Sequence, residues 1–149
     1  MERRNFISTT AALAASAAIT NFAKITNVFA DEHHHKNMGS PALTLAVAAS
    51  ECVVKGQACL QHCMDMLATG DTSMAACSKT VREMMVYCDA LSKAAAQGSK
   101  HMKELAKIAM ETCKDCEAEC RKHAEKHSVC KECAESCAEC YKQCKSMAA

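Results

Sequence analysis

Thirteen cysteines recur along this 149-residue chain, and most are separated by three, four or seven residues. Steps of three and four residues place side chains on one face of an α-helix, and the residues between them are mainly Lys, Glu, Gln, Asp and Ser, as on a solvated face. We therefore predict that every thiol points toward a helix-packed interior. The candidate ligands are Cys52, Cys59, Cys63, Cys77, Cys88, Cys113, Cys116, Cys120, Cys130, Cys133, Cys137, Cys140 and Cys144.

The helices that must carry these thiols are marked by start and stop signals. Ser40-Pro41 fits an N-cap followed by proline at the first helical position. Gly70-Asp71 and Gly98 separate later segments, and Ser99 and Ser128 are candidate caps. The sequence predicts helices over residues 41–69, 72–96, 100–126 and 129–147. Because the connections are short, neighbouring helices must run antiparallel, which predicts an all-α, up-down antiparallel four-helix bundle with a cysteine-lined core over 41–149.

The composition of this bundle is unusual for a hydrophobic core. All three phenylalanines lie before residue 30, tryptophan is absent, and Leu, Ile and Val after residue 30 together number thirteen, the same as Cys. Packing alone would favour leucine, which buries more apolar area than cysteine. A role for cysteine as a small hydrophobe is therefore disfavoured.

Disulfides are a second interpretation, since an exported chain would permit them. The cysteine count is odd, however, and thiols four residues apart on a helix have Cβ atoms about 5–6 Å apart. A disulfide needs about 3.5–4.5 Å. Disulfides between helices, in a structural or redox bundle, remain an alternative.

Zinc or an iron–sulfur cluster is a third interpretation, because Cys113/Cys116 and Cys130/Cys133 have the spacing of zinc ligands. These pairs fall within predicted helices rather than on turns. Each tetrathiolate zinc site also carries a charge of −2, which is costly to bury without counter-ions. Zinc or another soft metal remains open beside the next interpretation.

Copper(I) suits both thiols that lie within helices and a core without counter-ions. It prefers thiolate and thioether ligands, and one Cu⁺ per thiolate leaves the core neutral. The favoured hypothesis is therefore a core that binds multiple Cu(I) ions, about one per cysteine. Such a core offers no open catalytic position and no general base, so we expect no enzymatic activity.

Methionine and histidine gather at one predicted end of the bundle, where the first helix meets the second and the third meets the fourth. Thioethers and imidazoles are weaker ligands for Cu⁺ than thiolates, so they suit an opening for the metal. His62, Met66, Met74 and Met64 are the candidates for this opening; His123 and His127 lie nearby, but also read as exposed helix-end residues. Met84, Met85 and Met110 read as gap-fillers of the core, and His33–His35 as part of a polar linker over 31–40.

The first thirty residues have the order of an export signal. Arg3-Arg4 precedes an apolar run from Phe6 to Ile25, and Val28-Phe29-Ala30 resembles a cleavage site. This order predicts a bacterial twin-arginine signal peptide over 1–30, a periplasmic mature protein, and no membrane association after cleavage. A net charge of +1 with no basic face disfavours nucleic acid as a partner.

The chain resembles the bacterial copper storage proteins, in particular their exported branch. The segments that carry the resemblance are Ser50–Ala68, Ser73–Cys77, Thr112–Cys120 and Cys130–Cys144. The resemblance implies a homotetramer of four-helix bundles that stores Cu(I) on inward cysteines and exchanges it with donor or acceptor proteins. It also implies an opening at His62, Met66 and Met74. One family methionine position falls on Thr69, for which Met64 is a candidate substitute.

Overall fold

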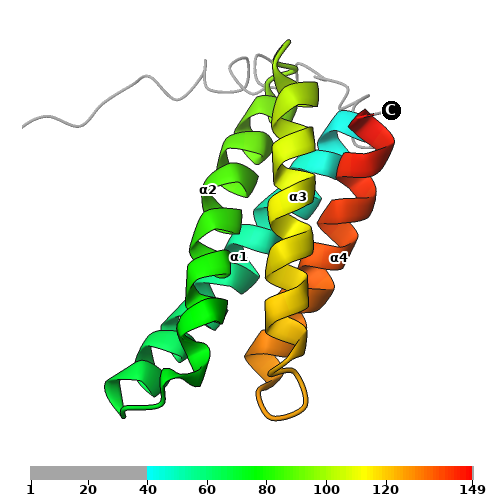
Figure 1. The fold of residues 1–149 in the computed structure, drawn as a ribbon. Helices are drawn as coiled ribbons and strands as arrows, with labels where there is room; N and C mark the ends of the chain where they lie inside the picture. The colour runs from blue at the N-terminus through cyan, green and yellow to red at the C-terminus, as the bar shows by residue number, and fades with distance from the viewer. Residues whose placement is uncertain (1–39, 149) are drawn as a thin grey trace, which may run out of the picture. The chain divides into compact units, whose positions relative to one another are not determined.

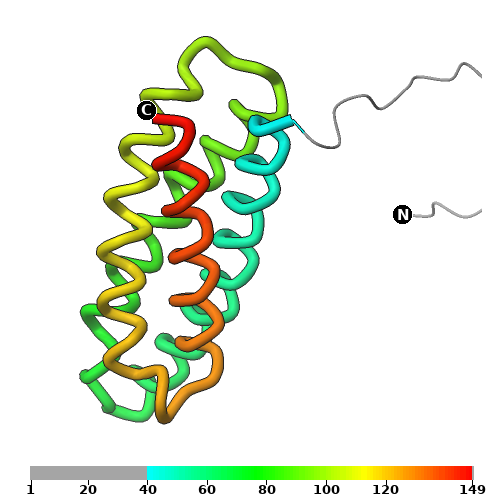
Figure 2. The backbone as a smooth tube through the Cα atoms, turned by 90° about the vertical axis from the view of Figure 1, so that its right-hand side faces the viewer, coloured from blue at the N-terminus to red at the C-terminus, as the bar shows by residue number. Residues whose placement is uncertain are grey.

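The computed structural model describes residues 40–148, which form a bundle of four long α-helices (Figure 1). In chain order these are α1 (Pro41–Ala68), the short 3-10 helix η2 (Thr72–Met74), α2 (Ala75–Ala96), α3 (Met102–Arg121) and α4 (Ser128–Ala148). Each long helix packs against two neighbours in the cyclic order α1, α2, α3, α4. The up-down antiparallel bundle predicted from the sequence is confirmed, and Figure 2 shows the four rods from the side.

The predicted helix signals act largely as expected. The Ser40 hydroxyl accepts a hydrogen bond from the Leu43 N–H at 3.2 Å, which caps α1 at the proline-containing first turn. Gly70 and Gly98 adopt φ values of 89° and 63°, a left-handed region that costs a residue with a Cβ free energy. These two glycines therefore allow the chain to reverse after α1 and after α2.

Three helix boundaries differ from the sequence-based expectation by two residues or more, and one of them is the start of the third helix, at Met102 instead of residue 100. The segment expected to start the second helix at residue 72 begins as η2, because Asp71 accepts a hydrogen bond from the Ser73 N–H at 2.9 Å and tightens this turn. The third helix ends at Arg121 rather than near residue 126. Residues 122–126 form turns instead, and this connection brings His127 to the start of α4.

The two ends of the bundle have different chemistry. We call the end with the α1–α2 and α3–α4 connections, at the bottom of Figure 1, the histidine end; it holds His62, His123 and His127. At the opposite, apolar end the interior is closed by four buried aliphatic side chains. These are Leu45, Leu91, Ala95 and Ala106.

Helix α1 is more apolar than burial within one chain explains. Among the described residues it alone has the length and composition to cross a membrane, with a mean hydropathy of 1.3 over its most apolar window, of which 39% is buried in the bundle. Its buried face supplies Cys52, Cys59 and Cys63 to the core. The predicted signal peptide over 1–30 and almost all of the linker lie outside the described residues.

Candidate metal-binding core

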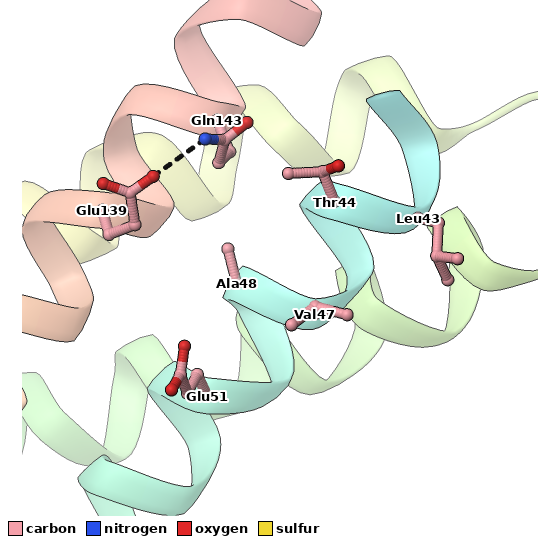
Figure 3. A pocket seen from close by; sticks show the side chains of 7 residues that line it. All are labelled: Leu43, Thr44, Val47, Ala48, Glu51, Glu139 and Gln143. Atoms are coloured by element: carbon pink, nitrogen blue, oxygen red, sulfur yellow. Dashed lines mark hydrogen bonds between the residues drawn. The ribbon is translucent and has the colours of Figure 1, made fainter. Parts of the chain in front are cut away.

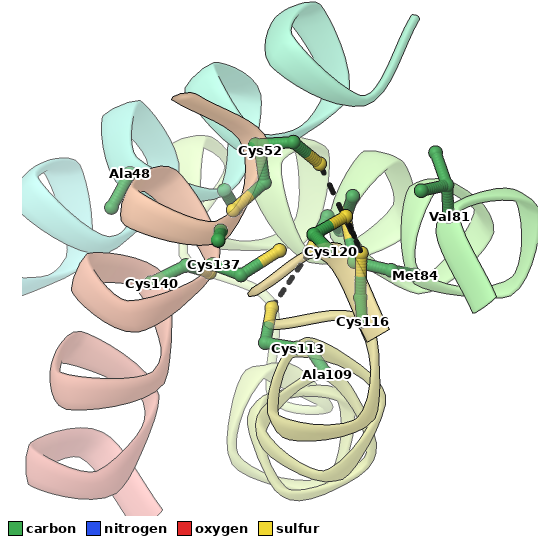
Figure 4. Close-up of a cluster of buried hydrophobic side chains, with 14 of the residues drawn as sticks. Ala48, Cys52, Val81, Met84, Ala109, Cys113, Cys116, Cys120, Cys137 and Cys140 are labelled. Carbon is green, nitrogen blue, oxygen red and sulfur yellow. Dashed lines mark hydrogen bonds between the residues drawn. The ribbon is translucent and has the colours of Figure 1, made fainter. Parts of the chain in front are cut away.

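All thirteen cysteines are fully buried in the bundle, so the prediction that they point inward is confirmed. The 3.6-residue period of each helix puts them on the core face, and the antiparallel packing then stacks them in layers along the axis. All thirteen are free thiols, and Figure 4 looks into part of this cluster.

Two of these layers take one thiol from each of the four helices. In the layer nearer the histidine end, Cys59 Sγ lies 4.0 Å from Cys77 Sγ, 3.9 Å from Cys120 Sγ and 3.8 Å from Cys130 Sγ. We call Cys59, Cys77, Cys120 and Cys130 the histidine-end layer. In the second layer all four Sγ atoms lie within 4.8 Å of one another. We call Cys52, Cys88, Cys113 and Cys140 the apolar-end layer.

The remaining thiols extend and connect these layers. Cys63 joins Cys59 and Cys77 on the side of the histidine end. Cys116 lies 3.9 Å from both Cys120 and Cys133, and with Cys133 and Cys137 it forms a group between the two layers. On the other side, Cys144 Sγ lies 3.9 Å from Cys140 Sγ. The thiols thus form a nearly continuous column along the bundle axis.

The surroundings of this column are apolar. No polar or charged side chain is buried among the described residues, so no lysine, arginine or protonated histidine lies in the core to compensate a net negative charge. The Cys52 thiol donates a hydrogen bond to the Ser136 carbonyl at 3.1 Å, which ties α1 to α4. Any ion held here must therefore cancel the charge of its own ligands.

Burial and mutual hydrogen bonding divide the thiols into two kinds. Burial raises the pKa of Cys63 to about 12 and that of Cys130 to about 11, because a thiolate loses its hydration there. Hydrogen bonds from Cys120 and Cys59 instead lower the pKa of Cys77 to about 3. Without metal, a few thiolates are thus stabilised by neighbouring thiols that keep their protons.

The histidine end brings together residues that are far apart in the sequence. His62 Nε2 on α1 lies 3.0 Å from His127 Nδ1 at the start of α4, and the two ring centroids are 4.6 Å apart. Both rings are half-buried, and each is one to three residues from a buried cysteine, Cys63 or Cys130. The sequence placed His62 and His127 at the same end of the bundle, and the structure adds the contact between their rings.

The three candidate methionines of the opening lie in different environments. Met74 is buried, with 1% of its surface exposed, and Met66 is half-buried and packs against the core. Met64 is 52% exposed and points away from the thiol column. Thr69 is also exposed, with its hydroxyl donating to the Met66 carbonyl at 2.7 Å. Met66 and Met74 therefore lie close to the column, whereas Met64 does not replace a core methionine.

A four-helix bundle whose interior is a column of free thiols is a helical container for soft metal ions. The sequence profile of the copper storage protein family matches residues 39–149. The chain therefore belongs to the copper storage protein family.

Solved structures of this family resemble the bundle along nearly their whole length. The Cu(I)-bound copper storage protein BsCsp3 is 29% identical, with a TM-score of 0.66, covering 73% of this chain and 99% of that protein. Apo-Csp3 from Bacillus subtilis is 30% identical, with a TM-score of 0.62, covering 71% of this chain and 97% of that protein. Comparison with curated proteins returns no match.

Proposed function

We propose that this protein stores Cu(I) on the thirteen buried cysteines, with about one ion per thiolate. The observation that carries the proposal is the column of free thiols in a core that contains no buried charged side chain among the described residues. Each Cu⁺ cancels one thiolate, so the loaded core stays neutral at any degree of filling. The solved BsCsp3 structure with Cu(I) supports this choice of metal.

Zinc is disfavoured by the same charge argument. The apolar-end layer has the four thiols of a tetrathiolate site, but Zn²⁺ on four thiolates would leave a charge of −2 beside aliphatic neighbours. Disulfides are disfavoured because every cysteine is a free thiol. The role is storage, with no chemical conversion of a substrate.

The decisive experiment is a titration of the fully reduced apoprotein with Cu(I) in the presence of a competing chelator. Saturation near thirteen ions per chain is expected. Saturation near three or four would contradict the proposal, because it would indicate isolated tetrathiolate sites. Free-thiol counting on protein purified without reductant is the control, since blocked thiols would lower the capacity for an unrelated reason.

We propose the histidine end as the opening through which donor or acceptor proteins exchange copper. His62 and His127 lie at the surface beside the Cys63 and Cys130 thiols, and Met66 and Met74 lie just inside. Imidazole and thioether ligands hold Cu⁺ less firmly than thiolates and so permit transfer.

The oligomer is proposed to be a homotetramer that uses the outer face of α1. Val47 and Val54 on this face are 58% and 63% exposed. Val47 also lines a groove of about 370 Å³ between α1 and α4, together with Leu43 and Ala48 (Figure 3). Exposed apolar surface of this kind marks protein interfaces. Light scattering on wild-type protein and on Val54→Glu tests this, with a smaller species expected for the variant.

Export by the twin-arginine route is proposed from residues 1–30. The family profile begins only at residue 39, which is consistent with a separate leader. Fractionation of cells that express the full chain should find the processed protein in the periplasm. Replacement of Arg3 and Arg4 by lysine should leave the precursor in the cytoplasm, and unchanged export would contradict this route.

A further inference from the structure

Between the histidine-end layer and the apolar-end layer, α1 and α2 supply no cysteine to the thiol column. On α1 the core face reads Cys52, Gly56, Cys59, and on α2 it reads Cys77, Val81, Met84, Cys88. Gly56 on α1, and Val81 and Met84 on α2, therefore occupy the core positions between the two layers. At an α-helical rise, Met84 lies about 6 Å along the axis from Cys88 and about 10 Å from Cys77.

The side chain of Met84 extends across the bundle at this level. It is fully buried, and its methyl carbon lies 2.9 Å from the point where a Cβ of residue 56 would stand. Any residue other than glycine at position 56 would force this methyl group to move. Gly56 thus leaves room on α1 for the side chains of Met84 and Met85, which enter from α2.

The facing helices α3 and α4 supply three thiols between the layers, Cys116, Cys133 and Cys137. The contacts Cys77–Cys120 and Cys88–Cys113, each 3.5 Å, bracket Met84 and place it opposite α3 near residue 116. The contacts of α1 with α4 in the same way place Gly56 opposite residues near 133. Cys116 and Cys133 lie 3.9 Å apart there. The space between the layers therefore contains the thiols of Cys116, Cys133 and Cys137 and the thioether of Met84, with no side chain from Gly56.

We propose that Met84 is a thioether ligand to Cu(I) between the two layers, beside the thiolates of the group formed by Cys116, Cys133 and Cys137. The proposal deepens the storage function and rests on it. Two thiolates and one neutral sulfur form a low-coordinate set of soft donors, which Cu(I) prefers. A thioether adds a ligand without adding charge, and the core stays neutral because the thiolates at this ion are shared with neighbouring Cu(I) ions, at about one ion per thiolate.

Met84→Leu tests the proposal, because this substitution conserves the side-chain volume and is among the changes that a core tolerates best. The matched control is Met85→Leu, since Met85 also packs on Gly56 but is half-buried. In chelator competition, Met84→Leu should weaken retention of at least one bound ion by about tenfold or more, the scale on which lost support at a metal site acts. Met85→Leu should match the wild type.

A second measurement follows the methionine side chains of the wild-type protein as it is loaded with Cu(I). With methionine methyl groups labelled with ¹³C, the Met84 resonance, assigned by its loss in Met84→Leu, should shift on Cu(I) loading more than that of Met85. Equal shifts, together with unchanged retention in Met84→Leu, would overturn the inference and leave Met84 a packing residue. A wild-type capacity of three or four ions would instead overturn the storage function itself, so the two failures are distinguishable.

Discussion

Cys77 on α2 and Cys120 on α3 bring their Sγ atoms to 3.5 Å, although 43 residues separate them in the sequence. Cys120 also lies within 3.9 Å of Cys59 and Cys116, so it is a junction of the thiol column. Cys144, in contrast, has one thiol neighbour at a similar distance, Cys140. Position in the column therefore decides how many bound ions depend on a given cysteine.

Replacement of Cys120 by alanine should lower the copper capacity by more than one ion, because Cys120 bridges neighbours on three helices. Cys144→Ala should lower it by about one. The measurement is Cu(I) titration of both reduced variants, with circular dichroism to show that each remains helical. Equal losses for the two variants would contradict a shared-ligand column and favour independent sites.

Removal of His62 should slow loading without changing capacity, since the imidazole lies at the proposed opening rather than in the column. His62→Ala also removes the contact with His127. His101→Ala is the matched control, because His101 is exposed next to α3 at the apolar end. Stopped-flow mixing with a Cu(I)–chelator complex measures the rate. A slow His101→Ala variant beside a normal His62→Ala variant would place the opening at the other end.

The stability of the apoprotein should fall as the pH rises above about 8.5, where cysteines of the unfolded chain ionise. Burial raises the pKa of Cys63 to about 12 and that of Cys130 to about 11, so the folded chain keeps protons that the unfolded chain releases. The contribution of these two thiols to stability is then complete below pH 8.5 and is lost progressively toward pH 11–12. Thermal melting of apoprotein from pH 7 to 11 measures this, and a flat profile would contradict it.

Copper loading should raise the melting temperature, because Cu(I) binds the assembled column and not the dispersed cysteines of the unfolded chain. One site filled at a thousandfold excess over its Kd contributes about 4 kcal/mol. The apoprotein should still fold, since aliphatic side chains such as Leu45 and Leu91 are fully buried without metal. Calorimetry on apo and loaded protein checks both points, and identical melting temperatures would contradict coupling.

Leu45→Ala should lower the stability of the protein without lowering its copper capacity. Leu45 is fully buried at the apolar end, and such truncations cost about 2–5 kcal/mol. Its side chain carries no ligand atom, so the copper capacity of the folded variant should equal that of the wild type. Denaturant unfolding and Cu(I) titration give the two values. A reduced capacity would show that the aliphatic end takes part in retention.

The sequence was sufficient to predict the helices and the face of each helix that carries thiols. Periodicity determines which residues share a face, and for this reason all thirteen cysteines could be placed in the core. It does not determine the axial register between helices. The layers, the pairing of His62 with His127 and the position of Met84 over Gly56 all depend on that register, so they required the structure.

Side-chain exposure near the helix ends was also beyond sequence reasoning. Met64 and Met66 are two residues apart, so they point to different sides of α1, and only Met66 packs against the core. The end of α3 at Arg121 depends on local turns at 122–126 that no glycine or proline marks. That early stop brings His127 next to His62.

Aliphatic side chains close the core at the apolar end. If copper passes at the histidine end, ions therefore enter and leave the core by one route. Ions in the apolar-end layer then lie behind those in the histidine-end layer and cannot leave ahead of them. The ions that were bound last would then be the first to be released. A brief demand for copper would remove only the ions that were bound last. The ions that were bound first would remain available during a prolonged shortage.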